Sequence, residues 1–204
     1  MFFGVVLAPA VGLELHGDTV VLPLLATQLL WINLITDGAP ALALGVDPPD
    51  EGLMHQPPRP ARERVITGRM WCGILFVGVV MAAGTLYVLD ASLPGGIVDG
   101  SGTLRFAQTR AFTTLIFFQL FNVFNARSDR DSAFRGLFRN QWLWAAVAVS
   151  VALQGVVLYT PFLQRAFSTQ ALSGFDWLYC ASIASSVLWL REIEKAFYRR
   201  HVKA

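Results

Sequence analysis

Charged residues are scarce in this 204-residue sequence. Asp, Glu, Lys and Arg make up 15% of it, against roughly 25% in an ordinary soluble domain, whereas 54% of the residues are hydrophobic. This shortage argues against a water-soluble globular protein. The same length, divided into spans of about 20 residues with connectors, accommodates roughly five to seven transmembrane helices. The composition therefore predicts a compact integral membrane protein.

Cysteine clusters and a basic binding surface are also lacking. The two cysteines, Cys72 and Cys180, lie in separate apolar runs, so neither a zinc site nor a disulfide framework is predicted. The formal net charge is only +2, and no stripe of Lys and Arg alternates with exposed aromatic residues. We therefore expect that the protein does not bind nucleic acid and that its main partner is the lipid bilayer.

The hydrophobic stretches predict an all-α, polytopic helical membrane bundle. A short apolar stretch over residues 1–13 contains Pro9 and is about half the length needed to cross a bilayer. The prediction is five full transmembrane helices plus this N-terminal part helix, in a single membrane domain of residues 1–204. The five longer stretches cover residues 22–44, 70–89, 111–126, 141–160 and 177–190, the last beginning nearer Phe175.

The distribution of Lys and Arg predicts the orientation of this bundle, because these residues are retained on the cytoplasmic side of a membrane. Thirteen of the 16 lie in or beside the Pro-rich loop of residues 45–68, around residues 127–139, or in the C-terminal tail. The alternate connectors hold only Arg105, Arg110 and Arg165. We therefore expect the Pro-rich loop and the C-terminus to be cytoplasmic, in a protein of the plasma (inner) membrane.

One predicted helix, over residues 22–44, carries an acidic residue near its middle. Asn33, Thr36 and Asp37 are spaced so that an amide, a hydroxyl and a carboxylate share one helical face. A carboxylate at this depth is unfavourable unless it is paired, hydrated or bound to a cation. The three side chains provide oxygen ligands of the kind that a hard cation such as Ca²⁺ prefers.

The residues after Asp37 predict a break in this helix. Gly38 weakens it, and Pro40 has no N–H to bond the carbonyl of Thr36. Freed carbonyls are tolerated inside a membrane where they line a cavity or bind an ion. Two interpretations remain open from these residues alone. Either Asp37 belongs to an ion or proton site, or the helix is merely kinked by proline and its polar side chains bond neighbouring helices.

A second row of polar residues lies on the predicted helix over 111–126. Gln119, Asn122 and Asn125 recur at intervals of three residues along one face. We expect Asn125, near the cytoplasmic end, to bond a neighbouring helix. Gln119 and Asn122 lie deeper, where they either ligate the cation or bond the neighbours of Asp37.

The segment LLWINLITDGAPALALG, residues 29–45, continues with Pro-Pro-Asp at 48–50 and Pro-Pro-Arg at 57–59. It closely resembles the sixth transmembrane helix and following loop of P-type cation-transporting ATPases, in the calcium-pump branch. FFQLFNVFNAR, residues 117–127, is similar to their eighth helix. By this resemblance, residues 1–13 end the fifth helix and residues 70–190 form the seventh to the tenth.

The resemblance implies that this chain contributes part of the ion site of an ATP-driven divalent-cation transporter. Asn33, Thr36 and Asp37 match ion-ligating positions of the family, with Asp37 as the central carboxylate. Gln119 stands where two-site pumps of the reticulum type carry a glutamate. In this respect the chain looks more like the one-ion pumps of the plasma membrane and the Golgi.

The sequence has no motif for ATP hydrolysis. It contains neither Asp-Lys-Thr-Gly nor Thr-Gly-Glu, the phosphorylation and dephosphorylation motifs of these pumps, and no P-loop. ATP and Mg²⁺ are therefore expected only through other domains, and no catalytic or cofactor-binding residue is assigned. One hypothesis makes the chain the C-terminal part of a pump, with the N-terminal pump portion as its partner. The alternative is a non-catalytic helical membrane protein, standing alone or serving as the partner subunit of a separate pump half.

Overall fold

The computed structural model describes residues 23–48, 66, 68–94, 100–127, 132–134 and 137–202, and every regular element in these residues is a helix. The expected all-α architecture is confirmed for them. The part helix expected over residues 1–13 and most of the Pro-rich loop over 45–68 lie outside the described residues. The helices are α2 (Ala26–Asp37), α3 (Ala39–Gly45), α4 (Gly68–Asp90), α5 (Leu104–Ala126), α6 (Gln141–Tyr159), α7 (Pro161–Phe167) and α8 (Gly174–Val202).

Several helices extend beyond the hydrophobic stretches that predicted them. α5 begins at Leu104, where the hydroxyl of Thr103 accepts a hydrogen bond from the backbone N–H of Phe106 at 3.2 Å and caps the helix. Arg105 and Arg110, expected in a connector, therefore lie inside α5. α8 likewise continues to Val202 through a charged segment. Hydropathy marks only the apolar part of a helix, so these ends were missed.

The short helix α7 was not predicted at all. Its first residue, Pro161, suits the first turn because its fixed φ is helical and its missing N–H has no helical partner there. The helix ends at Ser168, which adopts a left-handed conformation with φ of 50°. This turn reverses the chain between α6 and α8.

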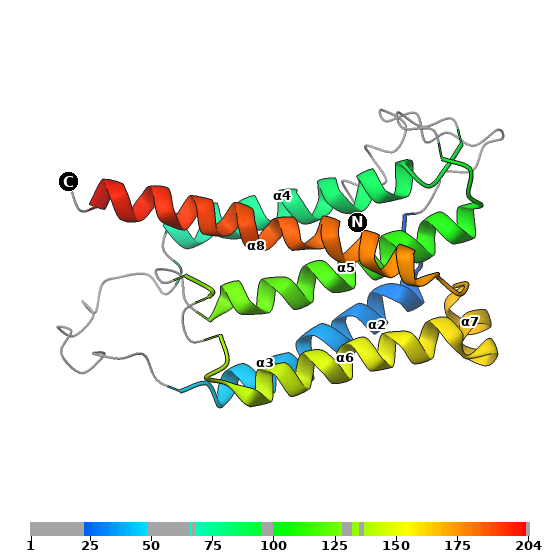
Figure 1. Cartoon of the computed structure of the whole chain (residues 1–204), viewed down its shortest axis with the longest axis horizontal. Helices are drawn as coiled ribbons and strands as arrows, with labels where there is room; N and C mark the ends of the chain where they lie inside the picture. The colour runs from blue at the N-terminus through cyan, green and yellow to red at the C-terminus, as the bar shows by residue number, and fades with distance from the viewer. Residues whose placement is uncertain are drawn as a thin grey trace.

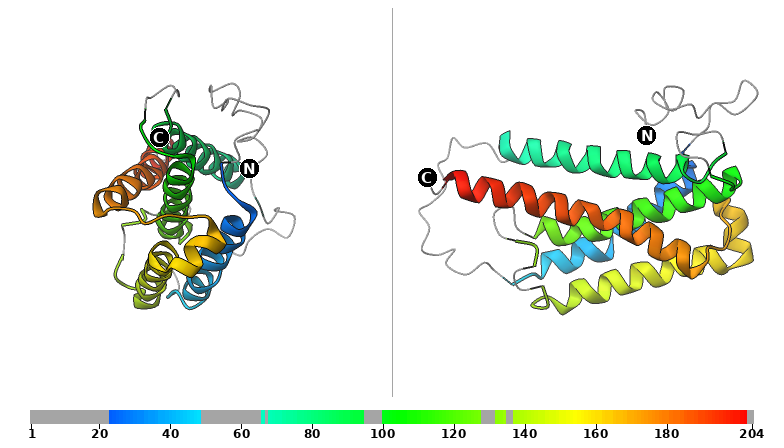
Figure 2. Two further views of the ribbon diagram at one scale, coloured as in Figure 1. Left: turned by 90° about the vertical axis from the view of Figure 1, so that its right-hand side faces the viewer. Right: turned by 45° about the horizontal axis from the view of Figure 1, so that its top comes forward.

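α5 is the central helix of the bundle. It contacts α4 and α8 on one side and α2 on another, while α6 runs beside α2 and α3 (Figure 1). The end-on view in Figure 2 shows α4, α5 and α8 as one group, and α2, α3, α6 and α7 as a second group below it. α5 therefore joins two layers that otherwise make few contacts.

Aromatic and aliphatic side chains form the two faces of α5. On one face, Phe112 and Ile116 pack against Ile32 of α2. On another face, Phe118 packs with side chains of α4 and α8 and is fully buried. Gly84 of α4 permits this approach, since a Cβ there would lie 2.5 Å from Cζ of Phe118.

The outer surface is apolar, whereas several polar side chains are buried. This is the reverse of the distribution in soluble proteins and is typical of a membrane bundle. α4 over Met70–Asp90 and α6 over Gln141–Tyr159 are long and apolar enough to cross a membrane, and no other described helix meets both criteria. Five full spans thus stay a prediction. Exposed hydrophobic residues include Ile74, Leu75 and Val79 of α4 and Val149, Leu153 and Val156 of α6, and buried polar residues include Gln28, Thr113, Ser150 and Gln154.

The close packing of α4 on α5 predicts the effect of two glycine substitutions. Gly84→Ala places a methyl group against the Phe118 ring and should lower the free energy of unfolding by about 1–3 kcal/mol, as overpacking does. Gly78→Ala, on the same helix, meets no atom within 4 Å and should leave stability equal or higher. Unfolding in detergent, followed by circular dichroism, distinguishes the two. Equal destabilisation by both would contradict the packing described for Gly84.

Candidate functional site

The break between α2 and α3 follows directly after the candidate ligands. Gly38, with φ of −71° and ψ of −89°, ends α2. Its N–H donates to the carbonyl of Leu34 at 3.3 Å, and a Cβ at this position would lie only 2.8 Å from the same oxygen. Glycine is therefore required for this close approach. The interruption predicted beside Asp37 is confirmed.

The candidate ligands on α2 differ in their surroundings. Thr36 is buried, and its hydroxyl donates a hydrogen bond to the carbonyl of Ile32 at 2.9 Å. In that bond Oγ1 is the donor, so the bond uses none of its lone pairs. Asn33 is exposed, next to the exposed Leu34. The side chain of Asp37 lies outside the described part of the structure.

Gln119 and Asn122 are half-buried on α5. On the helical wheel they lie between Ile116, which contacts α2, and Phe118, which packs with α4 and α8. Among the described residues, neither side chain forms a hydrogen bond with Asn33. No three His, Cys, Asp or Glu side chains come together as a metal site within the described ranges. The described residues therefore do not complete the predicted ligand set.

Asn125 bonds a neighbouring helix, as expected. Its side-chain amide donates to the carbonyl of Val187 in α8 at 3.4 Å. The ammonium group of Lys195, which is only 2% exposed, donates to the backbone carbonyl of Asn125 at 3.4 Å. This carbonyl lies in the last turn of α5, where helical acceptors lack partners and a cation is favoured. The sequence pattern had counted Lys195 only among the basic residues of the C-terminal tail.

α6 holds the broken helix through polar side chains. Gln154 accepts a hydrogen bond from Nε1 of Trp31 at 3.2 Å. Ser150 donates to the carbonyl of Ile35 at 3.2 Å, in the last turn before the break. These contacts were not predicted, because a serine and a glutamine in an apolar helix give no indication of which neighbour they face.

The N-terminal end of α2 is held from α7. Gln28 is fully buried; its amide donates to the carbonyl of Phe167 at 2.9 Å and its oxygen accepts from the N–H of Leu25 at 3.1 Å. The ring of Phe167 also lies 5.3 Å from that of Trp31. Gln28 is thus a structural contact between helices and not part of the exposed face that carries Asn33.

An ion pair joins the helices at the opposite end of the layer formed by α2, α3, α6 and α7. Arg127, just after α5, contacts both carboxylate oxygens of Asp47, at 3.1 and 3.3 Å. The amide of Asn140 donates to Asp47 at 2.9 Å and to the carbonyl of Ala43 at 2.8 Å, and its oxygen accepts from the N–H of Leu143. The ends of α3 and α5 and the start of α6 are therefore fixed together.

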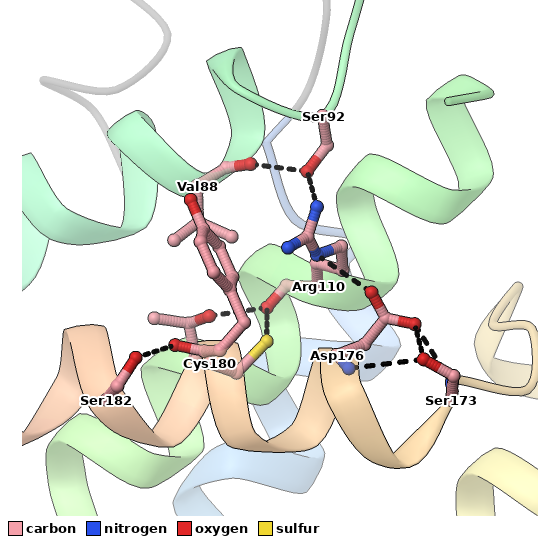
Figure 3. A network of polar contacts seen from close by, with 9 residues as sticks. Val88, Ser92, Arg110, Ser173, Asp176, Cys180 and Ser182 are labelled. Atoms are coloured by element: carbon pink, nitrogen blue, oxygen red, sulfur yellow. Dashed lines mark hydrogen bonds and ion pairs between the residues drawn. The ribbon is translucent and has the colours of Figure 1, made fainter. Parts of the chain in front are cut away.

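A second charged cluster surrounds Arg110, and it was not predicted from the sequence either (Figure 3). The guanidinium donates to the hydroxyl of Ser92 at 3.0 Å, and its Nε lies 3.6 Å from the carboxylate of Asp176. It also covers the ring of Tyr179, 4.2 Å from the centroid. Arg110 thus joins α5 to α8 and to the end of α4. This is a structural ion pair; nothing in its geometry indicates a bound ligand.

Comparisons with known proteins give a consistent result. Residues 21–197 match a family model described as "Cation transporting ATPase, C-terminus". The chain is 38% identical over 178 residues to calcium-transporting ATPase 1 of Yarrowia lipolytica, covering 87% of the chain and 19% of that protein. It is 37% identical over 182 residues to calcium-transporting ATPase type 2C member 1 of Homo sapiens, covering 89% and 19%. The chain thus spans about a fifth of the length of these curated relatives.

The Arg110 cluster predicts a charge-dependent effect on stability. Asp176→Asn leaves a largely buried guanidinium without its counter-charge but keeps an oxygen that can accept from the N–H of Ser173, and it should lower the free energy of unfolding by about 3 kcal/mol, the low end for breaking a buried pair. The double variant Arg110→Leu with Asp176→Asn should recover part of this loss, because no uncompensated charge remains. Detergent unfolding curves measure both. Additive losses in the double variant would show that the pair does not interact.

Proposed function

This chain belongs to the cation-transporting ATPase family as its C-terminal domain, and on that premise we propose that it forms the C-terminal membrane part of an ATP-driven pump for a divalent cation. Ca²⁺ is the first candidate, because the matched relatives are named calcium-transporting ATPases. In this proposal the rest of the pump is the partner of the chain. The pump lies in the plasma (inner) membrane, with the C-terminus of the chain in the cytoplasm.

The break between α2 and α3 is the observation that carries the proposal. It follows within one residue of a sequence that offers an amide, a hydroxyl and a carboxylate at Asn33, Thr36 and Asp37. Irregular backbone inside a membrane is tolerated where it lines a cavity or an ion site. Oxygen side chains beside such a break suit a hard cation better than they suit lipid.

The remaining ligands come from outside α2. Three side chains fall well short of the six to eight oxygens that Ca²⁺ takes. Asn122 and Gln119 of α5 are candidates for part of the difference, with Gln119 the weaker because a neutral amide attracts a divalent ion less than a carboxylate. The exposed face of α2 with Asn33 is suited to packing against preceding helices of the pump, which would supply the others.

ATP and Mg²⁺ would act through cytoplasmic domains beyond this chain, because its sequence has no phosphorylation motif. Phosphorylation there would change the accessibility of the ion site in the membrane. The loop over residues 45–68 connects α3 to α4 on the expected cytoplasmic side. The ion pair of Asp47 with Arg127 would keep this end of α3 fixed to α5 while the ion binds.

Substitutions at two of the three α2 positions test this function. In membrane vesicles that contain the complete pump, Asp37→Asn should abolish Ca²⁺-dependent phosphorylation from ATP and Ca²⁺ uptake, because the central carboxylate is lost. Thr36→Val keeps the shape of the side chain but removes its oxygen, and should raise the half-saturating Ca²⁺ concentration about tenfold, whereas Thr36→Ser should stay close to the native value.

The controls separate the pump from the alternatives. Ser182→Ala, on α8, should leave the Ca²⁺ dependence unchanged, since this hydroxyl bonds the Tyr179 carbonyl of its own helix. An antibody against the C-terminal tail should detect a polypeptide several times larger than 22.4 kDa. A product of 22.4 kDa that co-purifies with a separate pump half would support the partner-subunit alternative. Unchanged Ca²⁺-dependent phosphorylation in Asp37→Asn would reject the site.

A further inference from the structure

Two polar residues of α6 face two positions of α2 at the same spacing. Gln154 bonds Trp31, and Ser150 bonds the carbonyl of Ile35. The two α6 residues are four positions apart, as are their two partners, and the helices run in opposite directions (Figure 1). The two bonds therefore join one turn of α6 to one turn of α2. Each of the two α6 side chains is 1% exposed.

These contacts lie close to the candidate ligands along α2. Asn33 lies between Trp31 and Ile35, and Thr36 follows Ile35 directly. The Ile35 carbonyl belongs to the last turn before the break at Gly38, where regular helical bonding stops. Inside a membrane such an acceptor needs a donor from elsewhere, and the Ser150 hydroxyl is one.

Gln154 extends the contact to a third helix. While its oxygen accepts from Trp31, its amide nitrogen donates to the hydroxyl of Thr113 in α5 at 3.3 Å. Thr113 is fully buried. Glutamine has both an acceptor and a donor at its end, and this chain of bonds uses each of them. These bonds thereby fix the rotation of α2 relative to α5, the central helix of the bundle.

We propose that Ser150 and Gln154 are positioning residues for the cation site. Ser150 holds the Ile35 carbonyl at the break, and Gln154 fixes the rotation of α2 through the indole of Trp31. Neither residue touches the cation; both act through α2, whose oxygen-bearing face keeps a single orientation. The inference rests on the proposed function, because it requires a cation to bind at that face.

Hydrogen bonds are suited to this task in a way that apolar contacts are not. Between helices in a membrane, aliphatic side chains gain little from one another that lipid tails do not also offer. A rotation of α2 by one residue, about 100°, would leave the Trp31 N–H and the oxygen of Gln154 without each other in an apolar environment. The cost of such unpaired groups opposes rotation.

Ca²⁺ uptake by the complete pump in membrane vesicles tests the assignment of Ser150. Ser150→Ala should raise the half-saturating Ca²⁺ concentration about three- to tenfold, the change expected from one lost interhelical hydrogen bond. The maximal rate per folded pump should stay within about twofold, because the ligands themselves are intact. Ser150→Thr keeps the hydroxyl and should restore the native value. Ser182→Ala, the matched control on α8, should change neither quantity.

A double-mutant cycle tests the assignment of Gln154. Trp31→Phe removes the indole N–H but keeps an aromatic ring near Phe167. If Gln154 acts through Trp31, then Trp31→Phe and Gln154→Leu each raise the half-saturating Ca²⁺ concentration, and the double variant raises it little further than Gln154→Leu alone. Trp31→Phe is the milder change and decides the question if Gln154→Leu does not fold.

The outcomes separate this inference from the proposed function. If Asp37→Asn abolishes Ca²⁺-dependent phosphorylation but Ser150→Ala and Trp31→Phe leave the half-saturating concentration unchanged, the positioning role is wrong and the pump site stands. A fall in maximal rate alone, at unchanged half-saturation, would mean a merely structural contact and would also overturn the inference. If Asp37→Asn has no effect, the proposed function itself fails.

Discussion

A helix that is interrupted leaves backbone groups that need new partners, and the arrangement of this chain depends on how one such break is held. Gly38 ends α2 and α3 begins at the next residue, with Pro40 in its first turn. Lipid offers no hydrogen bonds, so the neighbouring helices must supply them. Ser150 bonds the carbonyl of Ile35 before the break, and Asn140 bonds that of Ala43 after it. α6 and the residue that precedes it thus hold α2 and α3 in place on either side of the break.

Apart from Asp37, whose side chain is not described, the ion pairs of the described residues lie toward the two ends of the bundle, and uncharged polar contacts lie between them. Arg110 and Asp176 join the helices at one end, and Asp47 and Arg127 do so at the other. Between these ends, the bonds of Gln154 and its partners involve no ionised group. A bilayer favours this distribution, because an ion pair is least costly near the interface and a neutral hydrogen bond is tolerated deeper. The polar contacts therefore specify which helices pair, while the apolar surface is suited to contact with lipid.

Part of the candidate site could be predicted from the residues and part could not. The break was predictable because glycine and proline act locally, on backbone bonds within four residues. That Asn125 bonds a neighbouring helix was predictable because a buried amide needs a partner, whereas its partner in α8 was not. Which partner a side chain finds is set by the packing of distant segments, so the partners of Ser150, Gln154 and Lys195 could not be predicted. α7 and the first turns of α5 were missed because their residues are not continuously hydrophobic.

The sequence by itself determined the helical membrane class and the break after Asp37, and it predicted the oxygen-bearing face of α2. Each of these follows from composition, from residue spacing or from the local chemistry of glycine and proline. Only the tertiary structure decided that α5 is central, that α6 holds the broken helix, and that Arg110 pairs with Asp176. The physical reason is that hydrogen bonds and ion pairs between helices join residues as far apart as Ile35 and Ser150, and no local pattern encodes that meeting.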